Sequence, residues 1–420
     1  MEETTKQKFR LTGLERAWIL YDVGNSAFVL LVATLIPIFF NALAAEGGLS
    51  SVEYLAYWGY AASAVTVITA ILSPILGTLA DTRNFKKPIF ILCLVVGVAG
   101  CCAMGLAKTW LPFLLIFIFA KVGFSGSLVF YDSMLGDVTT PDRMDEVSAR
   151  GYAWGYIGSC IPFVVCLALV LGAGSVGISQ LTALNIALFI TAAWWLVTSL
   201  PLLGQYRQLH YVEVERHAIR QSFARIGHTI RHLHEDRQVF WFLLAFFCYI
   251  DGVYTIIDMA TAYGTALGLD TTGLLLALLL TQVVAFPSAL VFGRLSTNHP
   301  STQLIPACIA AYAGIALFAF FLTQQWQFWV LAVAVGMFQG GVQALSRSHF
   351  AKIIPPEKSG EYFGLFDICG KGASFLGTMI VSVGSQLTGS ANVGVGSLIV
   401  LFVIGFVLFR VSTRTGKITG

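Results

Sequence analysis

The sequence predicts an all-α membrane protein in which twelve transmembrane helices form two pseudo-symmetric six-helix bundles. Three observations support this fold class: twelve long apolar runs, a one-sided distribution of lysine and arginine, and an internal repeat. The composition agrees, because 57% of the residues are hydrophobic, 11% are charged and the mean hydropathy is +0.78. Soluble proteins carry about 25% charged residues, so this composition excludes an ordinary soluble domain.

Each apolar run has about the length that a helix needs to cross the hydrocarbon core of a bilayer, which is roughly 20 residues. Turn-forming or charged residues separate consecutive runs, so each run is predicted to be one spanning helix. The runs comprise residues 17–40, 54–80, 88–107, 111–135, 150–172, 181–203, 239–264, 273–293, 303–322, 327–348, 362–387 and 393–411.

The basic residues fix the orientation when the runs are threaded back and forth through a bilayer. With both termini inside, 22 of the 25 lysines and arginines fall in inner segments, while Lys108 lies outside and Lys121 and Lys371 lie within spans. Basic loops stay on the cytoplasmic side, so we expect cytoplasmic termini. The net charge of +3 then indicates contact with anionic membrane lipids rather than with nucleic acid.

The chain contains a repeat that relates its two halves. The segment Gly77-Thr-Leu-Ala closes the second run, and Gly293-Arg-Leu-Ser closes the eighth, 216 residues later. Pro141-Asp-Arg is followed after 215 residues by Pro356-Glu-Lys. Two separate elements therefore agree on one register, which predicts two six-span halves of the same topology.

The two halves are joined by a polar linker. We expect an N-terminal bundle over residues 1–203, a cytoplasmic linker over 204–238 and a C-terminal bundle over 239–420. Apolar residues repeat in the linker at the spacing of one helix face, which predicts an amphipathic helix on the membrane surface or under the bundles. These residues are Ile219, Phe223, Ile226, Ile230 and Leu233.

Seven charged residues interrupt the spans, and we expect function to depend on them. At roughly 2.5–3.5 kcal/mol each, seven lipid-facing charges would cost on the order of 17–25 kcal/mol. That exceeds the net stability of a folded protein, which is about 5–15 kcal/mol. Most of them must therefore face the protein interior or water. They are Asp22, Lys121, Asp132, Asp251, Asp258, Asp367 and Lys371.

Depth and charge balance distinguish these residues. Lys121, Asp251 and Lys371 fall nearest the middle of the membrane, where secondary transporters bind their substrates. Five carboxylates against two ammonium groups leave surplus negative charge in a poorly solvated interior. We hypothesise that Asp251 takes up a proton during transport. Accumulation of substrate that remained fully proton-dependent in D251N would contradict this assignment.

Purely structural roles remain open for two pairs of these residues. Asp22 and Asn25 lie on one face of the first span, where they can clamp neighbouring helices by hydrogen bonds. Asp367 and Lys371 are one helical turn apart, where they can form an intrahelical ion pair.

The segment 77–87 carries a family resemblance. It resembles the loop between spans two and three of the major facilitator superfamily, with Gly77, Asp81 and the basic pair Lys86 and Lys87 in place. In that superfamily the acid sits near a helix N-terminus and its contacts hold one access state, which the helix dipole explains. The resemblance implies a conformational latch at these residues.

The match has departures. Thr82 and Asn84 stand where the superfamily prefers Arg and Gly, and the second copy of the motif has Thr297 in place of the acid. We therefore expect a latch on one side of the molecule, and we include Arg150 and Arg347 in it.

Within the superfamily the chain is similar to the autophagy-related vacuolar amino-acid effluxer family, which has many bacterial members. Three positions depart from that family's pattern: Val23 replaces a Trp, and Asp132 and Ile250 each replace an Asn. The motifs that carry the resemblance are Tyr21-Asp22-Val-Gly-Asn25-Ser26-Ala27, Phe130-Tyr131-Asp132, Val147-Ser148-Ala-Arg150-Gly151, Gly340-Gly-Val-Gln343-Ala-Leu-Ser346-Arg347-Ser348 and Phe363-Gly-Leu-Phe-Asp367-Ile-Cys-Gly-Lys371.

The resemblance implies a twelve-helix secondary transporter with a cavity between its halves, working by rocking-type alternating access. The buried charges favour coupling to protons, and we expect a multi-pass protein of a bacterial cytoplasmic membrane, with a monomer favoured over an oligomer. An amino acid or similar zwitterion suits the interior, because Lys121 or Lys371 can meet a carboxylate while Asp251 meets an ammonium group. Two alternatives remain: a transporter of lipids or other amphiphiles, and a membrane sensor that transports nothing.

Catalytic and metal-binding functions find no support in the sequence. It contains no HExxH or GxSxG motif, and Gly370-Lys371-Gly372 lacks the spacing of a phosphate-binding loop. The eight cysteines lie within spans without a CxxC pair, so we expect neither a disulfide nor zinc, and no cofactor.

Overall fold

The computed structural model describes residues 9–213, 231 and 233–416, and nearly all of them are helical. The predicted linker helix falls mostly on residues 214–230, which lie outside the described part. The first half of the chain forms α1 (Gly13–Ala33), α2 (Leu35–Glu46), α3 (Ser51–Ala80), α4 (Lys86–Met104), α5 (Trp110–Ser133), α6 (Leu135–Val138), α7 (Met144–Leu171), the 3-10 turn η1 (Ala173–Val176) and α8 (Gln180–Gln205).

The second half repeats this order of long helices. It forms α10 (Arg237–Ala266), α11 (Thr271–Leu295), α12 (Ser301–Phe320), α13 (Gln325–Ile353), the 3-10 turn η2 (Pro356–Lys358), α14 (Ser359–Thr388), α15 (Ala391–Gly396) and α16 (Ile399–Thr415).

By length and composition, eleven helical segments among the described residues can cross a membrane. The remaining predicted span corresponds to α14, which has 30 residues. At about 1.5 Å per residue, α14 extends roughly 45 Å, which exceeds the ~30 Å hydrocarbon core. Each of the twelve predicted spans therefore has a helical segment in the structure.

The first span differs from its predicted continuous run, because it is split into α1 and α2 at Thr34. There the backbone leaves the helical region, at φ −129° and ψ −74°, and the threonine hydroxyl donates a hydrogen bond of 2.6 Å to the carbonyl of Leu30. Pro37 follows in the first turn of α2, where a missing N–H leaves no helical bond unmade. Hydropathy does not detect this break, because every neighbouring residue remains apolar.

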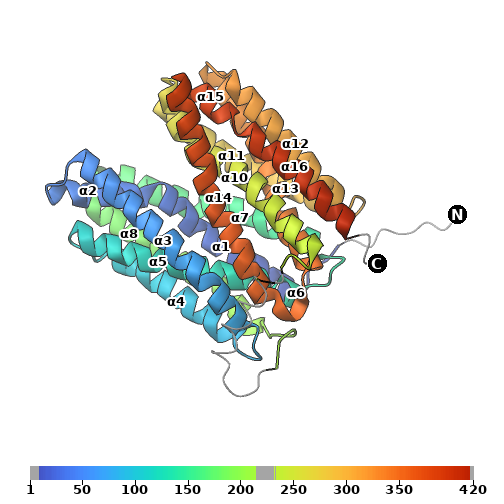
Figure 1. Ribbon diagram of the computed structural model, residues 1–420. Coiled ribbons are helices and arrows are strands. Elements are labelled where there is room, and N and C mark those ends of the chain that lie inside the picture. The colour runs from blue at the N-terminus through green and yellow to red at the C-terminus, as the bar shows by residue number, and fades with distance from the viewer. Residues whose placement is uncertain (1–8, 214–230, 232, 417–420) are drawn as a thin grey trace.

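Figure 1 shows two groups of helices, α1–α8 and α10–α16, which we call the N-terminal and C-terminal bundles. The bundles meet near α6 and diverge toward α2 and α15. We call these two ends of the molecule the α6 end and the α2 end. The loops at the α6 end are those that the charge distribution predicts to be cytoplasmic.

The described start of the linker lies against the α6 end of the N-terminal bundle. The backbone N–H of Val212 donates to the carbonyl of Asp81 at 2.8 Å, and the amide of Gln208 donates to the carbonyl of Ala80 at 3.0 Å. Residues 206–213 therefore fasten the turn between α3 and α4, which carries the predicted latch.

Candidate functional site

The described contacts between the bundles lie at the α6 end and fall on two junctions. In the first junction α3 and α5 pack against α14, and in the second α7 packs against α11 and α13, with α6 beside α13. Hydrogen bonds and ion pairs cross between the bundles from the parts of α1, α3, α4, α5, α7, α13 and α14 nearest the α6 end. The structure is therefore closed at the α6 end.

Two glycines let the backbones of α3 and α14 meet in the first junction. A Cβ added at Gly77 would overlap the carbonyl oxygen of Gly360, and a Cβ at Gly360 would overlap that of Gly77. One turn farther on, Asp81 accepts hydrogen bonds from the backbone N–H groups of Gly360, at 2.7 Å, and Glu361, at 2.8 Å. First-turn amides have no acceptor within their helix, and the helix dipole favours an anion there. Asp81 therefore caps α14 across the junction.

Lys86 completes this contact from a fully buried position. Its ammonium group donates to the Ser359 hydroxyl at 2.8 Å and lies 3.7 Å from Asp81. Burial raises the pKa of Asp81 to about 7, while Lys86 and the two amide donors oppose that rise. Asp81 thus gains or loses its charge near neutral pH in this conformation.

Asp137, which the sequence analysis did not select, ties the linker to the same contact. Its carboxylate lies 3.9 Å from the ammonium of Lys86, and accepts hydrogen bonds from the Tyr206 hydroxyl at 2.6 Å and the His210 backbone N–H at 3.0 Å. The His210 ring nitrogen Nδ1 lies 2.8 Å from it. No pattern around Asp137 in the sequence indicates these partners, because they come from the start of α4, the end of α8 and the segment that follows α8.

Arg347 of α13 holds the second junction by entering the N-terminal bundle. Its guanidinium lies 3.0 Å from the Asp132 carboxylate and 3.7 Å from that of Asp22. It also donates to the Ser148 hydroxyl at 2.9 Å and to the Ser148 carbonyl at 3.0 Å. With 2% of the side chain exposed, Arg347 is a buried cation shared by two carboxylates.

Aromatic rings enclose the same guanidinium. Its central carbon lies 4.3 Å from the ring centroid of Tyr152, 4.6 Å from that of Trp18 and 5.4 Å from that of Tyr131. Cation–π attraction grows when water is excluded, so the rings stabilise the charge that the two acids neutralise. Arg347 was predicted to belong to the latch, whereas no spacing in the sequence connects it to these rings.

A second ionic contact supports this junction nearer the α6 surface. Asp145 of α7 accepts a hydrogen bond of 2.6 Å from the Ser348 hydroxyl and lies 2.7 Å from the ammonium of Lys352. Neither Asp145 nor Lys352 was predicted as a site residue, because both lie at ends of helices where charge is common.

Three further ionisable residues of the predicted site belong to α5, α10 and α14. Asp258 of α10 is exposed, and it lies within electrostatic range of Lys121 of α5 in the other bundle. The Lys121 ammonium also lies 4.8 Å from the ring centroid of Phe124. Asp367 of α14 accepts a hydrogen bond of 2.8 Å from the Ser73 hydroxyl of α3. The Ser73–Asp367 hydrogen bond joins the two bundles within the α3–α14 junction.

Asp251 has a different environment from the one expected of a substrate contact. It is fully buried, and one carboxylate oxygen accepts hydrogen bonds from the Gly377 backbone N–H at 2.9 Å and the Thr255 hydroxyl at 3.3 Å. Both partners belong to the C-terminal bundle. The described contacts of Asp251 therefore lie inside one bundle and not between the two.

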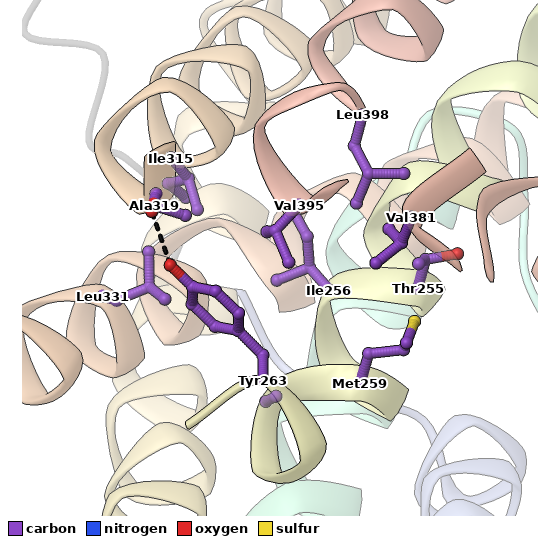
Figure 2. Close-up of a pocket in the computed structure, with 11 residues that line it drawn as sticks. Thr255, Ile256, Met259, Tyr263, Ile315, Ala319, Leu331, Val381, Val395 and Leu398 are labelled. Carbon is purple, nitrogen blue, oxygen red and sulfur yellow. Dashed lines mark hydrogen bonds between the residues drawn. The ribbon is translucent and has the colours of Figure 1, made fainter. Parts of the chain in front are cut away.

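A small pocket of about 20 Å³ lies next to Thr255 in the same bundle. Figure 2 shows its mostly apolar lining, in which the Tyr263 hydroxyl donates a hydrogen bond of 2.6 Å to the carbonyl of Ala319. Its volume suits about one water molecule, so it is too small for an organic solute.

The remaining predicted residues have local roles in the structure. Asn25 is buried and its amide lies 3.5 Å from the Asp22 carboxylate. Arg150 pairs with Glu146 of its own helix at 2.6 Å, so its described ion pair does not cross between the bundles. Lys87 is half-buried on the first turn of α4. The side chain of Lys371 lies outside the part that the structure describes.

Solved structures of two membrane transporters share this fold. The Major Facilitator Superfamily transporter FucP in the outward conformation has a TM-score of 0.73 and 15% identity, over 95% of this chain and 97% of that chain. The human organic anion transporter MFSD10 has a TM-score of 0.71 and 15% identity, over 94% and 98%. These likenesses show the twelve-helix major facilitator fold.

Relatives in sequence come from bacteria and fungi. YxiO of Bacillus subtilis strain 168, an uncharacterized MFS-type transporter, is 42% identical over 404 residues, which are 95% of this chain and 94% of YxiO. Autophagy-related protein 22 of Saccharomyces cerevisiae strain S288c is 28% identical over 290 residues, 58% of this chain and 53% of that protein. The chain thus matches about half the length of this fungal relative.

The family model described as vacuole effluxer Atg22 like matches residues 14–419, nearly the whole chain. The fold, the multi-pass membrane character and the bacterial relative agree with this match. The chain therefore belongs to the Atg22-like family of major facilitator superfamily transporters.

Proposed function

We propose that this transporter carries a small zwitterionic solute resembling an amino acid, and that Lys121 and Asp258 bind its two charged ends. The observation that carries this proposal is that these two groups come from opposite bundles, α5 and α10, and lie within electrostatic range of each other. A carboxylate on the solute matches the ammonium of Lys121, and an ammonium on the solute matches Asp258. Asp258 takes the role first considered for Asp251, because Asp251 contacts only its own bundle.

The closed α6 end supports alternating access, with the α2 end open to the outside in this state and both termini in the cytoplasm. Opening the α6 end requires Arg347 to leave Asp132 and Asp22, and Asp81 to leave the N-terminus of α14. Breaking a buried ion pair costs roughly 3–5 kcal/mol. Contacts formed only in the opposite state must offset that cost.

We also propose that the transport is coupled to protons through the cluster of Arg347, Asp132 and Asp22. Two carboxylates share the Arg347 guanidinium, so the buried group carries one surplus negative charge when both are ionised. A proton on Asp22, the acid farther from the guanidinium, would neutralise it. Asp251 is the second proposed proton carrier, because it is fully buried and its described partners are a backbone N–H and a hydroxyl.

The substrate assignment is tested with purified protein in liposomes, by measuring uptake of labelled neutral, basic and acidic amino acids and of sugars. We expect uptake of a zwitterion, and at least a tenfold loss in K121Q and in D258N. The matched controls K108Q and D142N change exposed residues of the same types and should transport normally. Uptake of a sugar alone, or selective binding of lysolipid without any uptake, would contradict the proposal.

The coupling is tested in the same liposomes with an imposed pH gradient. We expect D22N or D251N to exchange substrate across the membrane but to lose accumulation driven by the gradient. Gradient-driven accumulation that persists in both variants and in the double variant would show that neither acid carries the proton.

A further inference from the structure

A pocket of about 520 Å³ lies at the α6 end of the C-terminal bundle, where α12 begins and α16 ends. Figure 1 shows these two helices side by side at the edge of the C-terminal bundle that faces away from the N-terminal bundle. The pocket is separate from both junctions and from the proposed substrate contacts. It is lined by Thr302, Gln303, Phe406, Arg410, Thr413 and Arg414.

The lining has two positive charges and no acidic residue. Arg410 and Arg414 lie one turn apart on α16, both are exposed, and neither forms an ion pair with an acid in the part of the chain that the structure describes. Thr302 and Gln303 add a hydroxyl and an amide from the first turn of α12, which begins without a side-chain cap. The uncapped helix N-terminus adds a partial positive charge. The pocket is therefore suited to an anion.

An apolar surface continues from the arginines toward the middle of the membrane. Val403 and Val407 are 54% and 55% exposed, and their spacing places them on the same face of α16 as Arg410 and Arg414. Phe406 forms an apolar wall of the pocket, and its ring centroid lies 5.4 Å from the Arg410 guanidinium carbon. A ligand with an anionic head and an apolar tail can contact the arginines with its head and the apolar face of α16 with its tail.

We propose that this pocket binds the phosphate group of an anionic phospholipid, with the acyl chains along Val403 and Val407. Arginine binds phosphate through paired hydrogen bonds, and basic pockets between transmembrane helices on the cytoplasmic side bind lipid headgroups. Free inorganic phosphate offers the same oxygen atoms as a phospholipid headgroup. In either case two guanidinium groups would hold a pair of phosphate oxygens.

The test measures binding to the purified full-length chain in a neutral detergent. Native mass spectrometry and thermal shift would compare phosphatidylglycerol, phosphatidylcholine and inorganic phosphate. We expect phosphatidylglycerol to be retained selectively and to bind about 30-fold more weakly to R410Q/R414Q, since each arginine near an anionic headgroup contributes roughly a factor of five. R294Q removes an exposed arginine at the same end, outside the pocket, and should bind as the wild type.

The outcomes distinguish a phospholipid headgroup from free phosphate as the ligand of the pocket. Stabilisation by inorganic phosphate that is lost in the double variant supports the phosphate chemistry and assigns a soluble ligand. Equal retention of phosphatidylglycerol and phosphatidylcholine, or unchanged binding in the double variant, overturns the proposal. Binding to the wild type should also weaken with added salt, and this measurement requires no variant to fold.

Discussion

The two junctions between the bundles occupy related positions in the two halves of the chain but are held by different chemistry. In the α3–α14 junction, Gly77 allows backbone contact, and Asp81 one turn later caps the partner helix. In the second junction, Gly293 takes the place of Gly77 and would meet the Ala149 methyl if it had a Cβ. Thr297 takes the place of Asp81, and its hydroxyl donates to a carbonyl of its own helix instead.

This difference shows that the repeat preserves the glycine positions and not the interactions. The second junction lacks the capping acid, and a buried cation, Arg347, holds it together with Asp22 and Asp132. The first junction therefore depends on close backbone fit and on one carboxylate with a pKa near 7. The second depends on charge compensation away from water, which salt screens weakly.

The largest expected effect is that of removing Arg347. R347A leaves Asp22 and Asp132 buried beside no cation, which costs about 3–5 kcal/mol, so we expect the largest fall in the thermal unfolding midpoint of the purified protein. R347K keeps the charge but loses the planar guanidinium and its stacking on the rings. Its thermal unfolding midpoint should lie between those of the wild type and R347A. The matched control R294A changes an exposed arginine and should shift stability by less than about 0.5 kcal/mol. A wild-type midpoint in R347A would contradict the role of the cluster.

A methyl group at each of the two related glycines compares the junctions directly. G77A brings a methyl against a backbone oxygen that cannot move aside, so we expect the α3–α14 junction to weaken by about 1–3 kcal/mol. Hydrogen exchange of the amides at 359–364 should then speed up. The closest atom to the new methyl of G293A is the methyl carbon of Ala149, at 2.8 Å, so this variant should have a smaller effect that A149G reverses. Equal effects of G77A and G293A would argue against a difference in backbone fit.

The charge of Asp81 should make the first junction sensitive to pH. Burial raises the pKa of this acid from 3.8 to about 7, so the closed state binds the proton more tightly than a state with Asp81 in water. The closed state is therefore most stable below pH 4 and loses stability as pH rises to about 7. D81N keeps one acceptor oxygen but places its NH₂ against the second of the two amide donors, which costs about 1–3 kcal/mol, and it should remove the pH dependence. Amide exchange at 359–364, corrected for the intrinsic rate at each pH, measures both effects.

Much of the fold could be predicted from the sequence, because a bilayer forces each span to satisfy its backbone hydrogen bonds within one helix. Each apolar run therefore predicts one spanning helix, and the internal repeat predicts two related bundles. The break at Thr34 was not predicted, since it arises from a threonine and a proline inside an otherwise apolar run.

The candidate site could be predicted only in part. Asp251 and Asp258 lie seven residues apart, which places them on nearly the same face of α10. One is fully buried against α14 and the other is exposed, because the helices around α10 diverge toward the α2 end. Where that divergence begins is a property of the tertiary structure. The partners of Arg347 come from spans one, four and five, and no spacing in the sequence connects them.

The smallest expected effect comes from giving the second junction the acid that it lacks. Thr297 lies one turn beyond Gly293, where an added Cβ would lie 3.6 Å from Glu146, and the first turn of α7 carries Asp145 and Glu146. A carboxylate in T297D would meet these like charges, which offset the roughly 0.3–1 kcal/mol that a helix N-terminus offers an anion. We therefore expect no gain in the thermal unfolding midpoint relative to the neutral control T297N. A clearly higher midpoint in T297D would mean that an acid can cap a helix at the second junction as well as at the first. The residues around the second junction would then not exclude such an acid.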